Sequence, residues 1–155
     1  DVDCQSGPLC VKWSNKSLLA AGYFCSNDHV VWDTANDVHH TMDVHAASST
    51  CINVVEWTYW DNNPMLMTGH RDGSIKLHRD KGIVEWSHHE SAITGLVWCP
   101  VNRMVYSSSI NGTIVGFNLD CTTYRKEIQE HIFSLDISPD GSKLVVGTDD
   151  SVTIL

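Results

Sequence analysis

The chain has 155 residues, and 10 lysines and arginines against 19 aspartates and glutamates give a formal net charge of −9. This acidity disfavours nonspecific nucleic-acid binding, which depends on neutralising phosphates, and disfavours an anionic membrane surface. The sequence shows no run near the roughly 20 apolar residues that span a bilayer and no recognisable signal peptide.

Cysteine usage favours a reduced protein. The six cysteines are scattered, with no Cys-x-x-Cys spacing, and free cysteine behaves as a small apolar residue. We therefore expect an intracellular location, in the cytoplasm or the nucleus. Asn15-Lys16-Ser17 and Asn111-Gly112-Thr113 match the N-glycosylation pattern, but the second lies in a turn whose shape already explains its sequence.

Along the chain, alternation of apolar and polar residues predicts strands grouped in four units. The units span approximately residues 8–45, 51–88, 89–130 and 131–155. The strands expected in the first three are 9–13, 17–22, 29–33, 38–42, 52–57, 65–69, 74–78, 82–86, 93–98, 104–108, 113–117 and 123–128. The fourth unit reaches Leu155 without a fourth strand, and no long helical pattern is present.

Hairpin turns mark the middle of the units. Residues 68–79 are expected to form a hairpin around a two-residue Asp72-Gly73 loop, because glycine readily adopts the positive φ that such turns need. Asn111-Gly112 repeats the signal 39 residues later, and Asp149-Asp150 repeats it without glycine. In the strand after Asp72-Gly73, the alternation over 75–78 predicts one buried face and one more polar face.

The strand that opens each unit also repeats. Its matching triplets are Val11-Lys12-Trp13, Val55-Glu56-Trp57, Leu96-Val97-Trp98 and Leu135-Asp136-Ile137, spaced by 44, 41 and 39 residues. A period of about 40–45 residues with four strands per unit is typical of the blades of a β-propeller.

The chain resembles the WD-repeat β-propeller family over essentially its whole length. Trp32-Asp33 matches the Trp-Asp dipeptide of the family, and residues 138–141 match its turn after the first strand. The resemblance implies an all-β fold of four-stranded antiparallel blades. With about 3.75 blades, the chain is expected to be an incomplete portion of a seven-bladed propeller whose remaining blades belong to the same full-length chain. The alternative is a closed four-blade ring in which residues 1–4 supply the last strand.

The resemblance further implies a structural hydrogen-bond set in each blade: a histidine before the first strand, a serine or threonine in the second, a turn aspartate and a tryptophan. No copy of the set is complete, because His78, Phe117 and Leu155 stand where tryptophan is expected. The positions that match the repeat are Trp32, Asp33, Thr68, Asp72, His89, Ser107, Asn111, His131 and Asp150.

The residues give little indication of catalysis. Nine histidines raise the question of a metal site, but adjacent strand residues such as His39-His40 and His88-His89 point to opposite faces. Turn geometry accounts for the recurring turn aspartates. The sequence shows no nucleophile elbow, phosphate-binding loop or zinc motif. We therefore expect no enzyme activity, no metal and no cofactor.

The function expected is that of a non-catalytic protein-interaction scaffold, a WD-repeat subunit of an intracellular multiprotein complex. Its partners would be proteins or peptides, without direct contact to nucleic acid or membrane. One alternative is a peptide-recognition receptor, such as a substrate adaptor of a ubiquitin ligase or a reader of modified tails. Another is a propeller of ribosome assembly.

Partner contacts are expected in loops, because rigid blades hold variable loops in place. Arg71 could bind an acidic or phosphorylated peptide through bidentate contacts, or could be a solvated turn residue. Trp60, in an expected turn over 58–64, could contact a partner or fold back onto a neighbouring blade. The candidates on one presumed partner face, besides the insertion at 46–50, are Cys25, Asn27, Asn36, Arg71, Ile110 and Asp149.

Overall fold

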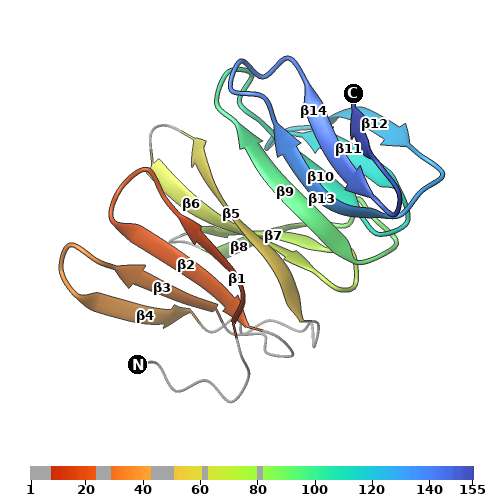
Figure 1. Cartoon of the computed structure of the whole chain (residues 1–155). Coiled ribbons are helices and arrows are strands. Elements are labelled where there is room, and N and C mark those ends of the chain that lie inside the picture. The colour runs from red at the N-terminus through yellow and green to blue at the C-terminus, as the bar shows by residue number, and fades with distance from the viewer. Residues whose placement is uncertain (1–7, 24–28, 43–50, 61–62, 80–81) are drawn as a thin grey trace.

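The computed structural model describes residues 8–23, 29–42, 51–60, 63–79 and 82–155, and in these residues it contains strands and no helix. The strands form four antiparallel sheets that follow one another in chain order (Figure 1). The all-β, partial-propeller prediction is confirmed. Since the described residues contain no helix, they offer none that could cross a membrane.

The first three sheets have four strands each and the last has three. The first consists of β1 (Pro8–Trp13), β2 (Leu18–Tyr23), β3 (His29–Asp33) and β4 (Val38–Met42). The second consists of β5 (Ile52–Trp60), β6 (Asn63–His70), β7 (Ile75–Arg79) and β8 (Gly82–Trp86). The third consists of β9 (Ile93–Cys99), β10 (Met104–Ser109), β11 (Thr113–Phe117) and β12 (Thr122–Glu127). The fourth consists of β13 (Ile132–Ile137), β14 (Leu144–Thr148) and β15 (Val152–Ile154).

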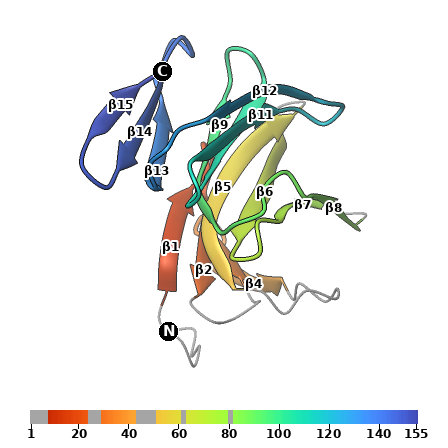
Figure 2. The same ribbon diagram turned by 90° about the vertical axis from the view of Figure 1, so that its right-hand side faces the viewer.

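The sheets pack face to face, chiefly through their first strands. Contacts link β1 to β5, β5 to β9, and β9 to β13. From these strands the sheets fan outward, so that β8 and β15 lie on opposite sides of the molecule (Figure 2). This radial arrangement is that of propeller blades.

Each sheet-to-sheet junction buries an apolar layer. Ala20, Ile52 and Trp57 belong to the layer between the first and second sheets. Ile75 and Leu96 belong to the next layer, between the second and third sheets. A third layer, between the third and fourth sheets, includes Ile114 and Val146. Burial of apolar surface in these layers is the main stabilising contribution, at about 25 cal/mol per Å².

The second sheet has neighbours on both faces, which corrects one expectation. All four residues of β7 from Ile75 to His78 are buried, including Lys76 at 1 % exposure. The polar face predicted for this strand therefore does not face water. Nζ of Lys76 lies 3.9 Å from Oε2 of Glu85, on β8.

The hairpin between β6 and β7 is longer than the two residues predicted. The N–H of His70 donates to the carbonyl of Ser74 at 3.0 Å, which leaves Arg71, Asp72 and Gly73 as a three-residue loop. Gly73 has φ +89°, and a Cβ there would collide with the carbonyl oxygen of His89. Glycine is therefore required both by backbone conformation and by the approach of the next blade.

Trp60 does not lie in a polar turn. The strands β5 and β6 extend beyond the predicted ends and pair through Trp60 and Asn63. The Trp60 side chain is only 7 % exposed and contacts the ring of Trp98 in the third sheet edge to face. Of the two alternatives for Trp60, the structure shows packing onto a neighbouring blade. The predicted partner contact is wrong for this side chain, because it is buried.

Apolar side chains are exposed at both ends of the row of sheets. On β1, Leu9, Val11 and Trp13 are 48 %, 62 % and 58 % exposed, and on β15, Val152 and Ile154 are 73 % and 66 % exposed. In a closed four-blade ring these two faces would be packed together. The described residues thus form an open arc, and residues 1–4, proposed as the closing strand, lie outside them.

Candidate functional site

The structural hydrogen-bond set is assembled in the second and third sheets with substitutions. Oγ1 of Thr68 lies 3.0 Å from Nε2 of His78 and 2.9 Å from Nε2 of His70. His78, at the position of the expected tryptophan, thus keeps the hydrogen bond to the second strand. In the third sheet, Nε2 of His89 lies 2.7 Å from Oγ of Ser107.

The turns complete these sets locally. Oδ1 of Asp72 accepts the N–H of Ser74 at 2.9 Å, and Oδ1 of Asn111 accepts the N–H of Thr113 at 3.3 Å. Among the described residues, Nδ1 of buried His89 has no hydrogen-bond partner. Burial, followed by the charges of His88 and Arg125, lowers the pKa of His89 to about 4.

The first and last sheets differ from the expected pattern. Asp33 accepts hydrogen bonds from Oγ of Ser17 and Nδ2 of Asn36, at 3.0 and 2.8 Å, and these bonds lower its pKa. In the last sheet, Nδ1 of His131 lies 3.1 Å from Oδ2 of Asp149. Asp149, predicted as a partner contact, thus occupies the structural role predicted for Asp150.

The candidate partner residues do not share one face. Arg71, Ile110 and Asp149 lie in turns after the second strand of their sheets. Asn36 lies between the third and fourth strands, and antiparallel pairing puts that turn at the opposite end of its sheet. Cys25, Asn27 and the insertion at 46–50 lie outside the described residues.

A cavity of about 1010 Å³ opens at the end of the sheets opposite Arg71. It lies where the first strands of all four sheets end. In its lining, one residue from each of these strands occupies an equivalent position, directly before the last residue of the repeated triplet. We call these the channel layer: Lys12, Glu56, Val97 and Asp136.

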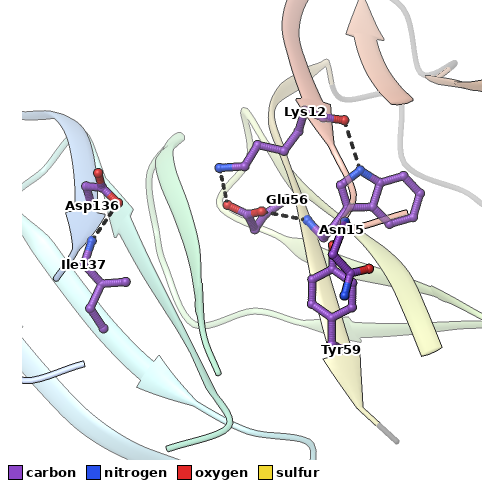
Figure 3. Close-up of polar contacts among 7 residues, drawn as sticks. Lys12, Asn15, Glu56, Tyr59, Asp136 and Ile137 are labelled. Carbon is purple, nitrogen blue, oxygen red and sulfur yellow. Dashed lines mark hydrogen bonds and ion pairs between the residues drawn. The ribbon is translucent and has the colours of Figure 1, made fainter. Parts of the chain in front are cut away.

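Lys12 and Glu56 form an ion pair across two sheets (Figure 3). Nζ of Lys12 lies 2.8 Å from Oε2 of Glu56, while Oε1 accepts the N–H of Trp57 at 2.8 Å. The indole N–H of Trp57 donates to the carbonyl of Lys12 at 3.0 Å. The Glu56 side chain is 7 % exposed, and this burial raises its pKa against the opposing effect of Lys12.

Asp136 lies on the opposite side of the cavity from this pair (Figure 3). Its Oδ1 accepts the N–H of Ile137 at 2.8 Å, the same local bond that Glu56 makes to Trp57. The Asp136 side chain is exposed, and its charge contributes to the raised pKa of Glu56. The channel layer therefore has one compensated and one exposed carboxylate.

Aromatic side chains form much of the cavity wall. Trp13 and Tyr59 both line the cavity. The hydroxyl of Tyr59 accepts the N–H of Asn15 at 2.6 Å. Trp98 contributes a further ring. A cavity with aromatic walls and a few charged groups is suited to binding a side chain or peptide. In the described part of the chain, no three histidine, cysteine or acidic side chains converge as metal ligands.

The channel layer was not among the residues predicted from the sequence. Its signal was nonetheless present, because the four members are the middle residues of the repeated triplets, and the residues on both sides of each are apolar. A polar residue flanked by two apolar residues on a strand indicates a side chain on the face opposite its neighbours. Three of the four positions carry a charge.

Comparisons with known proteins agree with this architecture. Residues 81–118 and 122–154 match the model of the WD domain, G-beta repeat. A chain in a crystal structure of the mitotic checkpoint complex superposes with a TM-score of 0.80 at 18 % identity, over 94 % of this chain and 45 % of that one. This chain thus spans less than half the length of that relative. No curated protein sequence matches it.

The fold is that of a partial β-propeller, and two of its blades match the family model by sequence. Residues 81–118 and 122–154 are WD repeats, and the first sheet has the same four-stranded blade fold. This family is generally non-catalytic, and its repeats support a role as a protein-interaction scaffold.

Proposed function

We propose that the chain is a non-catalytic scaffold subunit of an intracellular multiprotein complex and that it contacts a partner through the cavity at the channel layer. The cavity carries the proposal: all four sheets contribute to it, and its lining combines charged and aromatic groups. The similar chain belongs to a mitotic checkpoint complex, which supports assembly with other proteins as the working model. The scattered cysteines support the intracellular location.

A peptide-recognition receptor is the second candidate. The observation that favours it is a cavity whose lining combines two carboxylates with several aromatic side chains, since a cavity of this kind can hold one side chain of a peptide. A scaffold would bind a folded partner over a wide surface, whereas a receptor would bind a short peptide alone.

Site-specific photo-crosslinking in cells tests the scaffold proposal. A photoreactive amino acid is placed in the full-length protein at Asn15 on the cavity rim, at Arg71 on the opposite end, or at Lys126 on the outer strand β12 as a control. We expect Asn15 to crosslink one identified protein in stoichiometric yield, and Lys126 to give none. Equal, weak labelling at all three positions in a folded protein would overturn the proposal.

A further inference from the structure

We propose that the cavity at the channel layer receives a basic side chain, a lysine or arginine of a partner peptide, with Asp136 as the receiving carboxylate. This inference rests on the proposed function and specifies the chemistry of its ligand. It is drawn from the charges of the channel layer, the aromatic wall and the ion pair already present there.

The charge count of the channel layer favours a cation. Lys12 contributes one positive charge, and Glu56 and Asp136 contribute two negative charges. Since the ammonium of Lys12 lies 2.8 Å from Glu56, its charge is already compensated. Among the described residues, Asp136 has no ion pair, and its carboxylate is exposed at the cavity. The lining contains a second cation, Arg103, which is exposed in the turn between β9 and β10 and is not part of the channel layer.

The aromatic wall adds a second reason. A cation within about 6 Å of a tryptophan face is stabilised by the ring quadrupole, and tryptophan is the best aromatic side chain for this. Three tryptophans, Trp13, Trp57 and Trp98, are in the lining of the same cavity as Asp136. The formal charge of −9 on the whole chain would in addition attract a basic partner during association.

The Lys12–Glu56 pair shows that this layer accommodates a primary ammonium. Glu56 receives that ammonium at 2.8 Å while its other oxygen binds a backbone N–H. Asp136 has the equivalent backbone bond and lacks the ammonium. A lysine from a partner would therefore complete at Asp136 what Lys12 completes at Glu56. An acidic ligand would have to compete with Glu56 for Lys12.

Nuclear magnetic resonance titration with four blocked pentapeptides tests the proposal. The peptides have alanine at the flanking positions and lysine, arginine, norleucine or glutamate at the centre. We expect the lysine and arginine peptides to shift the indole N–H signals of Trp13 and Trp98, and the other two to leave them unchanged. Binding should weaken with added salt, because the contact is ionic. Binding of the glutamate peptide in place of the lysine peptide would overturn the proposal.

Two variants make the test specific. Asp136→Asn keeps the oxygen that accepts the Ile137 N–H but removes the charge, so affinity for the lysine peptide should fall about 5- to 10-fold. Asp150→Asn, with the same charge change in an exposed turn at the other end of the sheet, is the matched control and should leave affinity unchanged. Equal affinities of these two variants would contradict the role of Asp136.

Lys12→Met tests whether the site prefers a positively or a negatively charged ligand. If the site receives basic groups, removing the Lys12 ammonium leaves Glu56 available and the lysine peptide should bind about threefold or more tightly. If the site receives acidic groups, the same variant should lose binding. Should neither peptide bind while Asn15 still crosslinks a partner, the basic-ligand inference fails and the scaffold proposal stands.

Discussion

Nζ of Lys12 lies 2.8 Å from Oε2 of Glu56, and this ion pair joins the first sheet to the second. Because the Glu56 side chain is only 7 % exposed, Lys12→Met should leave a buried carboxylate without its cation and lower the free energy of unfolding by about 1–3 kcal/mol. Urea unfolding at pH 7 measures this. Adding Glu56→Gln should recover part of the loss, and a double variant no more stable than Lys12→Met would refute the explanation.

His89 should make the protein less stable in mild acid. Its pKa of about 4 lies below the ordinary value of 6.5, so the unfolded chain binds the proton more readily. The contribution of neutral His89 is therefore complete above pH 6.5 and is lost as the pH falls toward 4, by about 2 kcal/mol after allowance for solvent screening. Unfolding curves between pH 7 and pH 4.5 test this.

His89→Gln provides the comparison for this pH effect. Glutamine does not titrate and can still hydrogen-bond Oγ of Ser107, which lies 2.7 Å from the histidine ring nitrogen. The variant should show a shallower loss of stability over the same pH range. A pH dependence as steep as that of the unmodified protein would show that other groups cause it.

Trp60 should stabilise the folded chain and should not contact a partner. It is 7 % exposed, and its ring centroid lies 4.9 Å from that of Trp98. Trp60→Ala should cost about 3–4 kcal/mol, as expected for removal of a large buried side chain, and Trp60→Phe should cost less. Thermal unfolding distinguishes the two. Unchanged stability of Trp60→Ala would instead favour the alternative in which Trp60 contacts a partner.

The exposed end face of the last sheet should promote self-association of the 155-residue chain. Val152 and Ile154 are 73 % and 66 % exposed on β15. Replacing both with lysine should shift the chain toward monomer in analytical ultracentrifugation, with the unfolding midpoint changed little. A distribution of species identical to that of the unmodified chain would exclude this face as the cause.

Arg71 lies at the end of the sheets opposite the cavity, so a variant at this residue tests which end the partner contacts. Its side chain is exposed in the three-residue loop, so Arg71→Ala should leave thermal stability unchanged within about 0.5 kcal/mol. If the partner uses the cavity, the variant should also keep the crosslink formed from Asn15. Loss of that crosslink with normal stability would move the partner surface to the Arg71 end.

The sequence predicted the blades well because each blade encodes its own alternation and turn. Most predicted strands end within a residue of those observed. The exceptions are β5 and β6, which extend to Trp60 and Asn63 because Trp60 is covered by the third sheet. The prediction of a polar face on β7 was wrong for a similar reason. Burial of Lys76 depends on a neighbouring sheet, which alternation within one strand does not describe.

The candidate site was harder to predict, because loops were expected to hold it. The sequence of a turn does not show which end of a sheet the turn occupies, so the prediction groups Asn36 with Arg71 although the antiparallel order separates them. The channel layer requires four residues far apart in sequence to meet, as Lys12 and Glu56 do. Only the packing of one blade on the next brings them together.

The residue before the last residue of each repeated triplet affects which ligands the channel of such a protein prefers. At this position the four blades carry Lys12, Glu56, Val97 and Asp136, while the flanking residues remain apolar and keep the sheets together. Changing the exposed residue Asp136 alters the chemistry of the channel without removing an ion pair among the described residues. Lys12 and Glu56 join two sheets, and Val97 is buried in the layer between the third and fourth sheets, so changes at these three positions also affect the interfaces between blades. A small library randomised at the Asp136 codon, with Lys12, Glu56 and Val97 kept, therefore changes the ligand preference of the channel on an unaltered frame.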